Sequence, residues 1–290
     1  MERMSGPTTP QPPAPSCYRH PDRQTHLRCH RCGRNVCPEC MRTAGDSLEC
    51  VECAQGIAPA IRQPHTLEPH TQFGGRQRSG APLITYALIA LNVGVFVLQV
   101  ASPGLERQLA LWPPAVAAGQ FYRLVSSAFV HYGATHLLFN MWALYVVGPP
   151  LERWLGPLRF GALYALSGLG GSVLAYLLSP LNSATAGASG AVFGLFAATF
   201  VLARRLQLDA RGVVVVIGIN LAFTFFARSQ ISWQGHVGGL VTGALVSAAY
   251  VYAPRELRNL IQATVTIGAL VVFAALIWWR TGELVAELTT

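Results

Sequence analysis

The chain has 290 residues, of which 52% are apolar and 12% are charged, and its formal net charge is +8. This composition excludes a disordered chain, and it is too apolar for an ordinary soluble protein of this length. Seven of the thirteen acidic residues precede position 81, and all seven cysteines lie between Cys17 and Cys53. Two regions of different chemistry therefore follow one another along the chain.

The first region is predicted to contain a leader, a cysteine-rich block and a linker. Residues 1–16 are rich in proline and carry no apolar run of the kind that a secretory signal needs, so we predict a disordered leader. The block occupies 17–53, and a linker rich in Pro, Gly, Gln and Arg follows over 54–80. From position 81 onward the chain becomes apolar.

The block contains four pairs of metal-ligand residues, and two residues separate the members of each pair. The pairs are Cys17 and His20, Cys29 and Cys32, Cys37 and Cys40, and Cys50 and Cys53. Eight such ligands complete two tetrahedral zinc sites and leave no cysteine over. Disulfides would need an oxidising compartment, whereas the topology inferred below places the block in the cytosol. We therefore expect two structural Zn²⁺ ions that stabilise the fold and take no part in catalysis.

Over about forty residues the block resembles a B-box-type zinc finger. Its ligands suggest a cross-brace, in which one ion is bound by Cys17, His20, Cys37 and Cys40 and the other by Cys29, Cys32, Cys50 and Cys53. Sequential pairing, in which the first two pairs along the chain bind one ion and the last two bind the other, also fits the spacing. His26 and His30 are spare candidates that the ligand count does not require. We expect this domain to bind a cytosolic protein partner or to regulate the rest of the chain.

The remaining sequence divides into seven apolar stretches that are candidates for membrane-spanning helices. A hydrocarbon core about 30 Å thick is crossed by about 20 helical residues. We predict spans at 83–101, 134–150, 158–178, 187–203, 212–227, 235–252 and 260–279. The acidic residues between 81 and 280 should all fall in the intervening turns, since lipid disfavours charge. They are Glu106, Glu152, Asp209 and Glu256.

The distribution of arginines predicts the orientation of these spans, because short cytoplasmic loops retain positive charge during insertion. With the amino terminus inside, 17 of the 21 arginines are cytoplasmic. The four on the outside are Arg107, Arg123, Arg228 and Arg280. The chain is then a multi-pass protein of the cell membrane, with its carboxyl terminus outside. This topology explains the basic charge, so we favour it over nucleic-acid binding.

Polar residues recur on the second, fourth and sixth spans, which all begin on the outer side and therefore have their first turns at one depth. Those turns carry His136 and Asn140, then Ser189, then His236. Such side chains are costly against lipid and normally face a bundle interior or a wet cavity. Each alone also fits helix packing or a hydrogen bond to a carbonyl. Their shared depth on alternate helices favours catalysis.

Ser189 and His236 together predict a catalytic dyad. A serine hydroxyl is a poor nucleophile until a neighbouring base takes its proton, and His236 is the base available. The predicted spans contain no aspartate or glutamate, so an acidic third member is missing. Asn140 and His136, one turn apart on one helix face, would donate hydrogen bonds to an oxyanion together with the amide of Ser189.

Small residues permit the two helices of the dyad to approach one another. Gly190 and Gly194 on the fourth span recur four residues apart, as do Gly239 and Gly243 on the sixth. Such faces let helix backbones pack closely inside a membrane. We therefore expect the fourth and sixth spans to be in direct contact.

The motifs resemble those of the rhomboid family of intramembrane serine proteases over about 83–252. They are His131-x4-His136-x3-Asn140, Gly187-Ala188-Ser189-Gly190 and His236-x2-Gly239-x3-Gly243. The resemblance implies an all-α membrane protein with a six-helix core over 81–254 and a seventh helix with a short tail over 255–290. It also implies Ser189 as nucleophile, His236 as general base, and His136 with Asn140 as the oxyanion hole.

Two positions depart from the family pattern. Tyr122 and Arg123 look like a variant of the family's Trp-Arg pair, in a first loop that the resemblance places half-sunk in the outer leaflet over 120–131. Phe193 stands where many members carry a tyrosine that stacks on the base. Stacking survives that change, although the phenol hydroxyl does not. We therefore expect activity to persist, with the properties of the catalytic base altered by the loss of the hydroxyl.

The function implied is an intramembrane serine endopeptidase that cleaves single-pass transmembrane proteins near the outer face through an acyl-enzyme. Its catalysis requires no cofactor. One alternative is a catalytically silent rhomboid-like protein that binds membrane clients and uses the zinc domain as an adaptor; the presence of both dyad residues argues against it. Another is a small-solute transporter, whose polar residues would spread through the midplane instead of clustering near one face.

Overall fold

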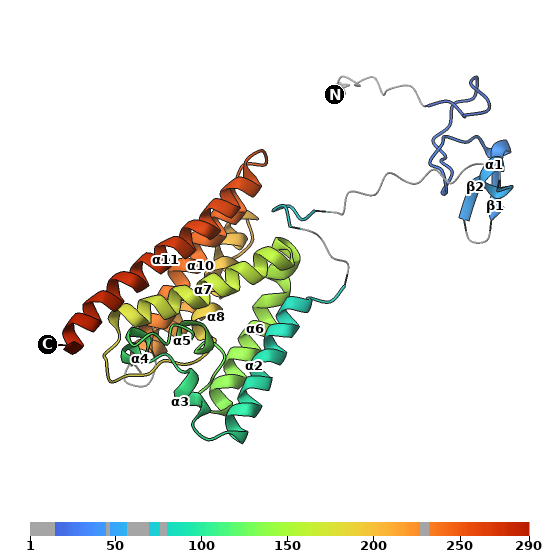
Figure 1. Cartoon of the computed structure of the whole chain (residues 1–290). Coiled ribbons are helices and arrows are strands. Elements are labelled where there is room, and N and C mark those ends of the chain that lie inside the picture. The colour runs from blue at the N-terminus through green and yellow to red at the C-terminus, as the bar shows by residue number, and fades with distance from the viewer. Residues whose placement is uncertain (1–14, 45–46, 57–69, 76–79, 227–231, 290) are drawn as a thin grey trace, which may run out of the picture. The chain divides into compact units, whose positions relative to one another are not determined.

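The structure is a computed structural model that describes residues 15–44, 47–56, 70–75, 80–226 and 232–289 (Figure 1). The chain divides into two compact units, Met1–Glu68 and Pro69–Thr290. Most of the leader predicted over 1–16 and of the linker predicted over 54–80 falls outside the described residues. The domain limits predicted from the sequence stay predictions.

The first unit is small and contains little regular structure. A 3-10 turn, η1 (Pro38–Cys40), leads into β1 (Met41–Ala44), which pairs antiparallel with β2 (Ser47–Cys50) before the one-turn helix α1 (Val51–Ala54). Its buried core consists of Val36 and six of the seven cysteines. A unit of this size without a larger apolar core needs metal ions or cross-links for stability.

All the named secondary-structure elements among the described residues of the second unit are helices, which confirms the predicted all-α membrane fold with a small Cys/His-rich region before it. Its main helices are α2 (Leu83–Ala101), α6 (Ala134–Leu155), α7 (Pro157–Leu178), α8 (Ser189–Arg205), α9 (Arg211–Phe226), α10 (Trp233–Tyr252) and α11 (Arg258–Thr289). Three short helices lie between α2 and α6, namely α3 (Leu105–Leu109), α4 (Pro113–Ala117) and α5 (Arg123–Ser126).

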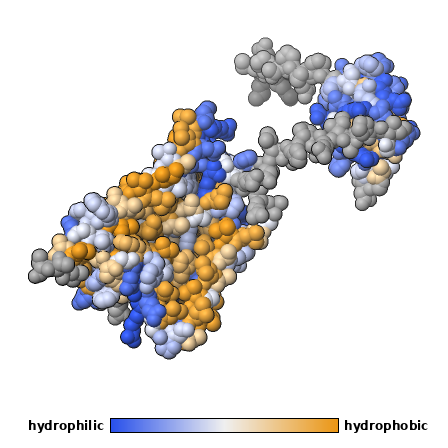
Figure 2. Space-filling view, viewed as in Figure 1, coloured by the Kyte–Doolittle hydropathy of each residue, from blue (hydrophilic) through white to orange (hydrophobic). Residues whose placement is uncertain are grey.

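Apolar residues cover large parts of the face of the helical unit that Figure 2 shows, where they are coloured orange. Among the described helices, α2, α7 and α11 are long and apolar enough to cross a membrane, and α9 is apolar but shorter. Only 11% of the most apolar stretch of α2 and 6% of that of α11 are buried inside the protein. Apolar faces this extensive are stable against lipid but not against water. The other helices, α6, α8 and α10, carry the polar candidate residues and many of the glycines.

Helix α8 packs directly against α10, as the glycine spacing predicts. A Cβ added to Gly239 would collide with the backbone of Gly190, and one added to Gly243 would collide with the backbone of Gly194. The two backbones therefore touch with no side chain between them. Almost every residue in the first half of α8 is buried, so this helix occupies the interior of the unit.

Helix α6 extends to Leu155, beyond the predicted end at position 150, and contains Pro149 and Pro150. The prediction that Glu152 lies in a turn is therefore wrong. Its buried carboxylate accepts hydrogen bonds from the backbone N–H of Ile84 at 3.0 Å and of Thr85 at 2.9 Å. These N–H groups begin α2 and have no partner within that helix, so the charge of Glu152 is stabilised without water.

A short segment before α2 also belongs to the helical unit. The side chain of Phe73 is 1% exposed and lies in the same apolar core as Leu155. The amide of Gln262 on α11 donates a hydrogen bond to the carbonyl of Phe73 at 3.2 Å. Residues 70–75, which the sequence suggested as linker, are thus packed against α6 and α11.

Candidate active site

Ser189 and His236, which lie 47 positions apart in the sequence, are in hydrogen-bond contact. Ser189 is the first residue of α8, and His236 lies in the first turn of α10. The distance from His236 Nε2 to Ser189 Oγ is 2.7 Å. His236 is 8% exposed, so its imidazole is held largely away from solvent. This is the geometry in which an imidazole can take the proton of a serine hydroxyl.

The aromatic side chain of Phe193 fixes the ring plane of His236. Phe193 lies one turn after Ser189 on α8, and its ring stacks on the imidazole with 4.2 Å between centroids and 16° between planes. The stacking expected from the sequence is therefore present without a phenol hydroxyl. Because Phe193 is itself 3% exposed, the imidazole has little freedom to rotate out of this plane.

His136 lies beside the loop that leads into Ser189. A Cβ added to Gly187 would lie 2.6 Å from His136 Cε1 and 2.9 Å from Nε2, so only glycine fits between this loop and the ring. The backbone N–H of Tyr132 donates to His136 Nδ1 at 3.4 Å. A neutral imidazole that accepts at Nδ1 carries its proton on Nε2. His136 thus presents an N–H donor next to the segment that carries Ser189.

Asn140 is buried one turn further along α6. Its side-chain amide donates a hydrogen bond to the backbone carbonyl of His136 at 2.9 Å. A carboxamide has two N–H groups, so a second donor is left for another acceptor. Because α8 begins at Ser189, the backbone N–H of that residue also has no partner within its helix.

The loop between α2 and α6 is held by the buried side chain of Arg123. Its guanidinium donates to the carbonyls of Arg107 and Ala110, each at 2.7 Å. The same loop pairs with the segment before Ser189 through two backbone hydrogen bonds between Leu111 and Thr185. The guanidinium and this pairing therefore fix the position of the loop relative to the dyad. Tyr122 is exposed, and Cζ of Arg123 lies 5.7 Å from the centre of the Tyr122 ring.

Sequence reasoning missed one contact of the dyad. The hydroxyl of Thr224 on α9 lies 2.7 Å from Nδ1 of His236. The sequence held a signal for it, since Asn220 and Thr224 are polar residues four positions apart within an apolar span. Nothing in the sequence indicated, however, that this face of α9 meets the start of α10.

The first unit, called the Cys/His unit below, contains two clusters of possible metal ligands. Within each cluster the ligand atoms lie within 4.8 Å of one another. One cluster is formed by Cys17, His20, Cys37 and Cys40, and the other by Cys29, Cys32, Cys50 and Cys53. This grouping matches the cross-brace and not sequential pairing. All seven cysteines are free thiols.

The distances within the clusters suit a tetrahedral ion. His20 Nδ1 lies 3.3 Å from Cys37 Sγ and 3.4 Å from Cys40 Sγ. In the second cluster Cys32 Sγ and Cys50 Sγ lie 3.8 Å apart. Sulfur ligands at about 2.3 Å from Zn²⁺ are separated by about 3.8 Å in a tetrahedron. Both clusters can therefore hold a metal ion with little rearrangement.

The pKa shifts of Cys17 and Cys40 in the first cluster are opposite, since burial and a hydrogen bond with Cys37 raise the pKa of the Cys40 thiol to about 11. Burial also opposes the ionisation of Cys17, but backbone hydrogen bonds around Cys37 and His20 outweigh burial and lower the pKa of Cys17 to about 6. Metal ions bind the thiolate, so the lowered pKa of Cys17 reduces the competition from protons at that ligand.

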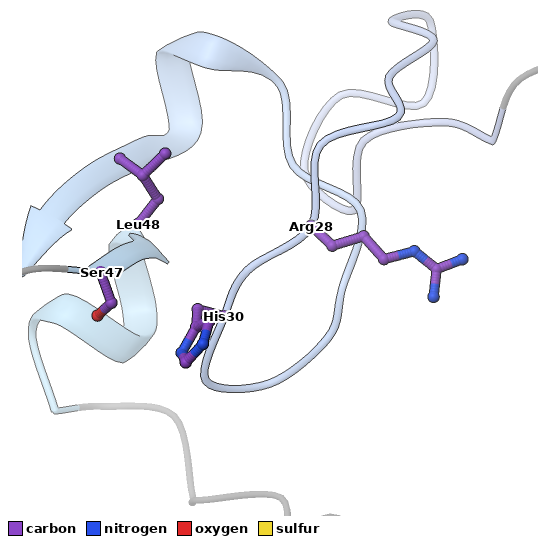
Figure 3. A pocket seen from close by; sticks show the side chains of 4 residues that line it. All are labelled: Arg28, His30, Ser47 and Leu48. Atoms are coloured by element: carbon purple, nitrogen blue, oxygen red, sulfur yellow. The ribbon is translucent and has the colours of Figure 1, made fainter.

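The Cys/His unit also has a shallow hollow, lined by Arg28, His30, Ser47 and Leu48 (Figure 3). None of these residues belongs to either metal cluster. His30, a spare ligand candidate in the sequence, lines this hollow and stays outside both clusters.

Comparison with known proteins identifies the helical unit. Residues 118–253 match the family model described as the Rhomboid domain. Over 216 residues, which are 62% of this chain and 76% of the relative, the chain is 30% identical to the rhomboid protease AarA of Providencia stuartii. The chain belongs to the rhomboid family. It is also 40% identical to the putative rhomboid protease YdcA of Bacillus subtilis over 136 residues, which are 46% of this chain and 68% of that one.

This rhomboid matches less than half of the length of one of its relatives. The chain is 37% identical to the rhomboid protease GluP of Bacillus subtilis over 230 residues, which are 67% of this chain but only 45% of GluP. Family membership and the apolar helices together locate the chain in a membrane. The B-box-like assignment of residues 17–53 stays a prediction.

Proposed function

We propose that this rhomboid is an intramembrane serine endopeptidase that cleaves transmembrane proteins through a Ser189–His236 dyad. The observation that carries the proposal is the 2.7 Å separation of His236 Nε2 and Ser189 Oγ at the start of two helices. The similarity to proteins named as rhomboid proteases supports it.

The first half of the reaction is acylation. His236 Nε2 accepts the proton of Ser189 Oγ as the oxygen attacks the carbonyl carbon of the substrate peptide bond. Negative charge then develops on the carbonyl oxygen. His136, Asn140 and the backbone N–H of Ser189 donate hydrogen bonds to it. The tetrahedral intermediate breaks its C–N bond, and the leaving amine takes the proton from His236.

The second half releases the acyl group. Water reaches the ester from the aqueous side, loses a proton to His236 Nε2, and attacks the carbonyl carbon. The C–O bond to Ser189 breaks, and its oxygen recovers the proton. All proton transfers pass through His236, so this chemistry uses no cofactor.

The expected substrate is a single-pass transmembrane protein cut near the outer face of the bilayer. The dyad lies on the first turns of α8 and α10, close to one end of the helices. The arginine distribution supports an orientation with the amino terminus in the cytoplasm and the carboxyl terminus outside. An extended peptide can approach the dyad only where its own helix has unwound, which is easiest near a water interface.

The Cys/His unit is proposed to bind two structural Zn²⁺ ions. Each cluster offers four ligands of the type that zinc prefers, which leaves no open position for a catalytic water. A cytosolic protein partner of this unit stays a prediction, as does the alternative of a catalytically silent protein that binds membrane clients.

A cleavage assay in proteoliposomes tests the proposed activity. A single-pass reporter with a fluorescent external domain is reconstituted with the wild-type chain, Ser189→Ala or His236→Ala. Release of the external domain by the wild type alone supports the protease. Capture of the reporter without cleavage by all three proteins would instead support the silent binding protein.

A further inference from the structure

His236 is contacted on three sides by residues of two neighbouring helices, α8 and α9. Its Nε2 faces Ser189 on α8, and its ring lies flat on Phe193 of the same helix. Its Nδ1 lies 2.7 Å from the hydroxyl oxygen of Thr224 on α9. The dyad described above accounts for Nε2 but assigns no role to Thr224.

The hydroxyl proton of Thr224 is already engaged elsewhere. Thr224 Oγ1 lies 2.7 Å from the backbone carbonyl of Asn220, one turn earlier in α9. A carbonyl can only accept, and two oxygens 2.7 Å apart repel unless a proton lies between them, so the single proton of the hydroxyl points to Asn220. Toward His236 the oxygen of Thr224 therefore offers only lone pairs.

This arrangement selects one tautomer of the imidazole. Because Thr224 Oγ1 can only accept from His236, the ring proton must reside on Nδ1. A neutral imidazole protonated at Nδ1 has an unprotonated Nε2. The nitrogen that faces Ser189 is then free to take its proton, as a general base must. The opposite tautomer would place a proton on Nε2 and block this step.

Burial of Thr224 strengthens its influence on the tautomer of His236. Thr224 is 1% exposed and is the buried residue of α9, whose other described side chains are half-buried or exposed. A buried hydrogen bond has no water to replace it when one partner is removed. The position of α9 relative to α10 therefore acts on the catalytic base through this contact.

We propose that Thr224 is a positioning residue that holds His236 in the Nδ1-protonated tautomer and thereby keeps its Nε2 ready for Ser189. The proposal rests on the function proposed above. The threonine hydroxyl is neutral, so it orients the imidazole but adds no negative charge to stabilise the imidazolium. We therefore expect a smaller contribution than that of a carboxylate in a catalytic triad.

Two substitutions separate the hydroxyl from the shape of the side chain. Thr224→Val preserves the branched shape and removes the hydroxyl, whereas Thr224→Ser preserves the hydroxyl and removes a methyl group. The expected result is that Thr224→Val lowers kcat for reporter cleavage roughly tenfold with KM unchanged, and that Thr224→Ser retains most of the activity. Equal losses in both variants, or no loss in Thr224→Val, would overturn the proposal.

A matched control tests whether any loss of a helical threonine hydroxyl has this effect. Thr199 on α8 makes the same kind of bond, from its hydroxyl to the carbonyl of Leu195 at 2.8 Å, but belongs to no part of the site. Thr199→Val should leave kcat unchanged. A tenfold loss in this control would mean that the effect of Thr224→Val is not specific to His236.

The tautomer is measured directly from ring ¹⁵N chemical shifts of His236 in the histidine-labelled, full-length protein, assigned by comparison with His236→Gln. Under alkaline conditions, where imidazole is neutral, the proposal predicts a protonated Nδ1 and an unprotonated Nε2 in the wild type. A protonated Nε2 would overturn it even if Thr224→Val failed to fold. This measurement needs no activity, whereas failure of the proposed function would appear as an inert wild type in the cleavage assay.

Discussion

Gly239 on α10 lies against the backbone of Gly190 on α8 with no room for a Cβ between them. This contact is three residues from His236 and one residue from Ser189 in sequence, so it sets the separation of the two catalytic candidates. Small residues at helix contacts are a common means of close packing in membranes. Here the close packing also positions a hydrogen bond.

Substitution of this glycine should therefore impair both stability and activity. In Gly239→Ala the new methyl group overlaps the Gly190 carbonyl, so the helices must separate. We expect destabilisation on the order of 1–3 kcal/mol and a loss of kcat of roughly a hundredfold. Thermal unfolding in detergent and reporter cleavage measure the two effects. Gly268→Ala on α11 is the control, because nothing lies within 4 Å of that position. Equal behaviour of the two variants would contradict this account of the contact.

The loop before Ser189 offers a test of the oxyanion donors. Gly187 has a φ of +124°, and a Cβ there would lie 2.6 Å from His136 Cε1. Gly187→Ala should displace the ring and lower kcat about a hundredfold, which is the typical cost of losing one oxyanion donor. The measurement is kcat for reporter cleavage, compared with His136→Ala.

Gly119→Ala is the control for backbone strain without a steric clash, because φ is +95° at Gly119 and nothing lies within 4 Å of the added Cβ. We expect this variant to keep most of its activity. If His136 acts as a donor, the Gly187→Ala, His136→Ala double variant should be no less active than either single variant, because both remove the same interaction. Additive losses would argue against a shared cause.

The buried carboxylate of Glu152 predicts an effect on stability with little effect on chemistry. It accepts three hydrogen bonds, from the N–H groups of Ile84 and Thr85 and from the Thr85 hydroxyl at 2.8 Å. Glu152→Gln replaces one acceptor oxygen by an N–H₂ group that faces donors. We expect a loss of about 2 kcal/mol, measured by unfolding in detergent. Glu256 is exposed, so Glu256→Gln should have no such effect. A comparable loss of stability in that variant would refute the stabilising role of the Glu152 hydrogen bonds.

The two metal clusters can be distinguished by counting ions. The intact protein should bind two Zn²⁺ per chain by elemental analysis, because each cluster supplies four ligands. The double variant Cys17→Ser, Cys40→Ser removes two ligands of one cluster and should retain one ion. Sequential pairing would place these ligands on different ions, so loss of both would contradict the cross-brace. His30→Ala should retain two ions, because His30 lies outside both clusters.

Much of the candidate site could be predicted from local sequence patterns. The residues Ser189, His236, His136 and Asn140 lie near the starts of helices, and helix starts and membrane depth can both be inferred from apolar spacing. The glycine contacts were also predictable, because small residues four positions apart indicate close helix packing.

Features that depend on contacts between distant segments could not be predicted in this way. The role of Thr224 arises from how α9 meets α10, and that of Phe73 from how a segment before α2 meets α6 and α11. The end of α6 lies beyond the predicted span because the helix continues through the charged residue Glu152. Its charge is tolerated there because the start of α2, 67 positions away, supplies the donors.

Mapping of a covalent adduct tests the central proposal most directly. The purified full-length protein is treated with a fluorophosphonate, which reacts with activated serine hydroxyls, and the modified peptide is located by mass spectrometry. We predict a single adduct on Ser189 that is lost in Ser189→Ala and strongly slowed in His236→Ala. An adduct elsewhere, or labelling that persists unchanged in Ser189→Ala, would contradict the account.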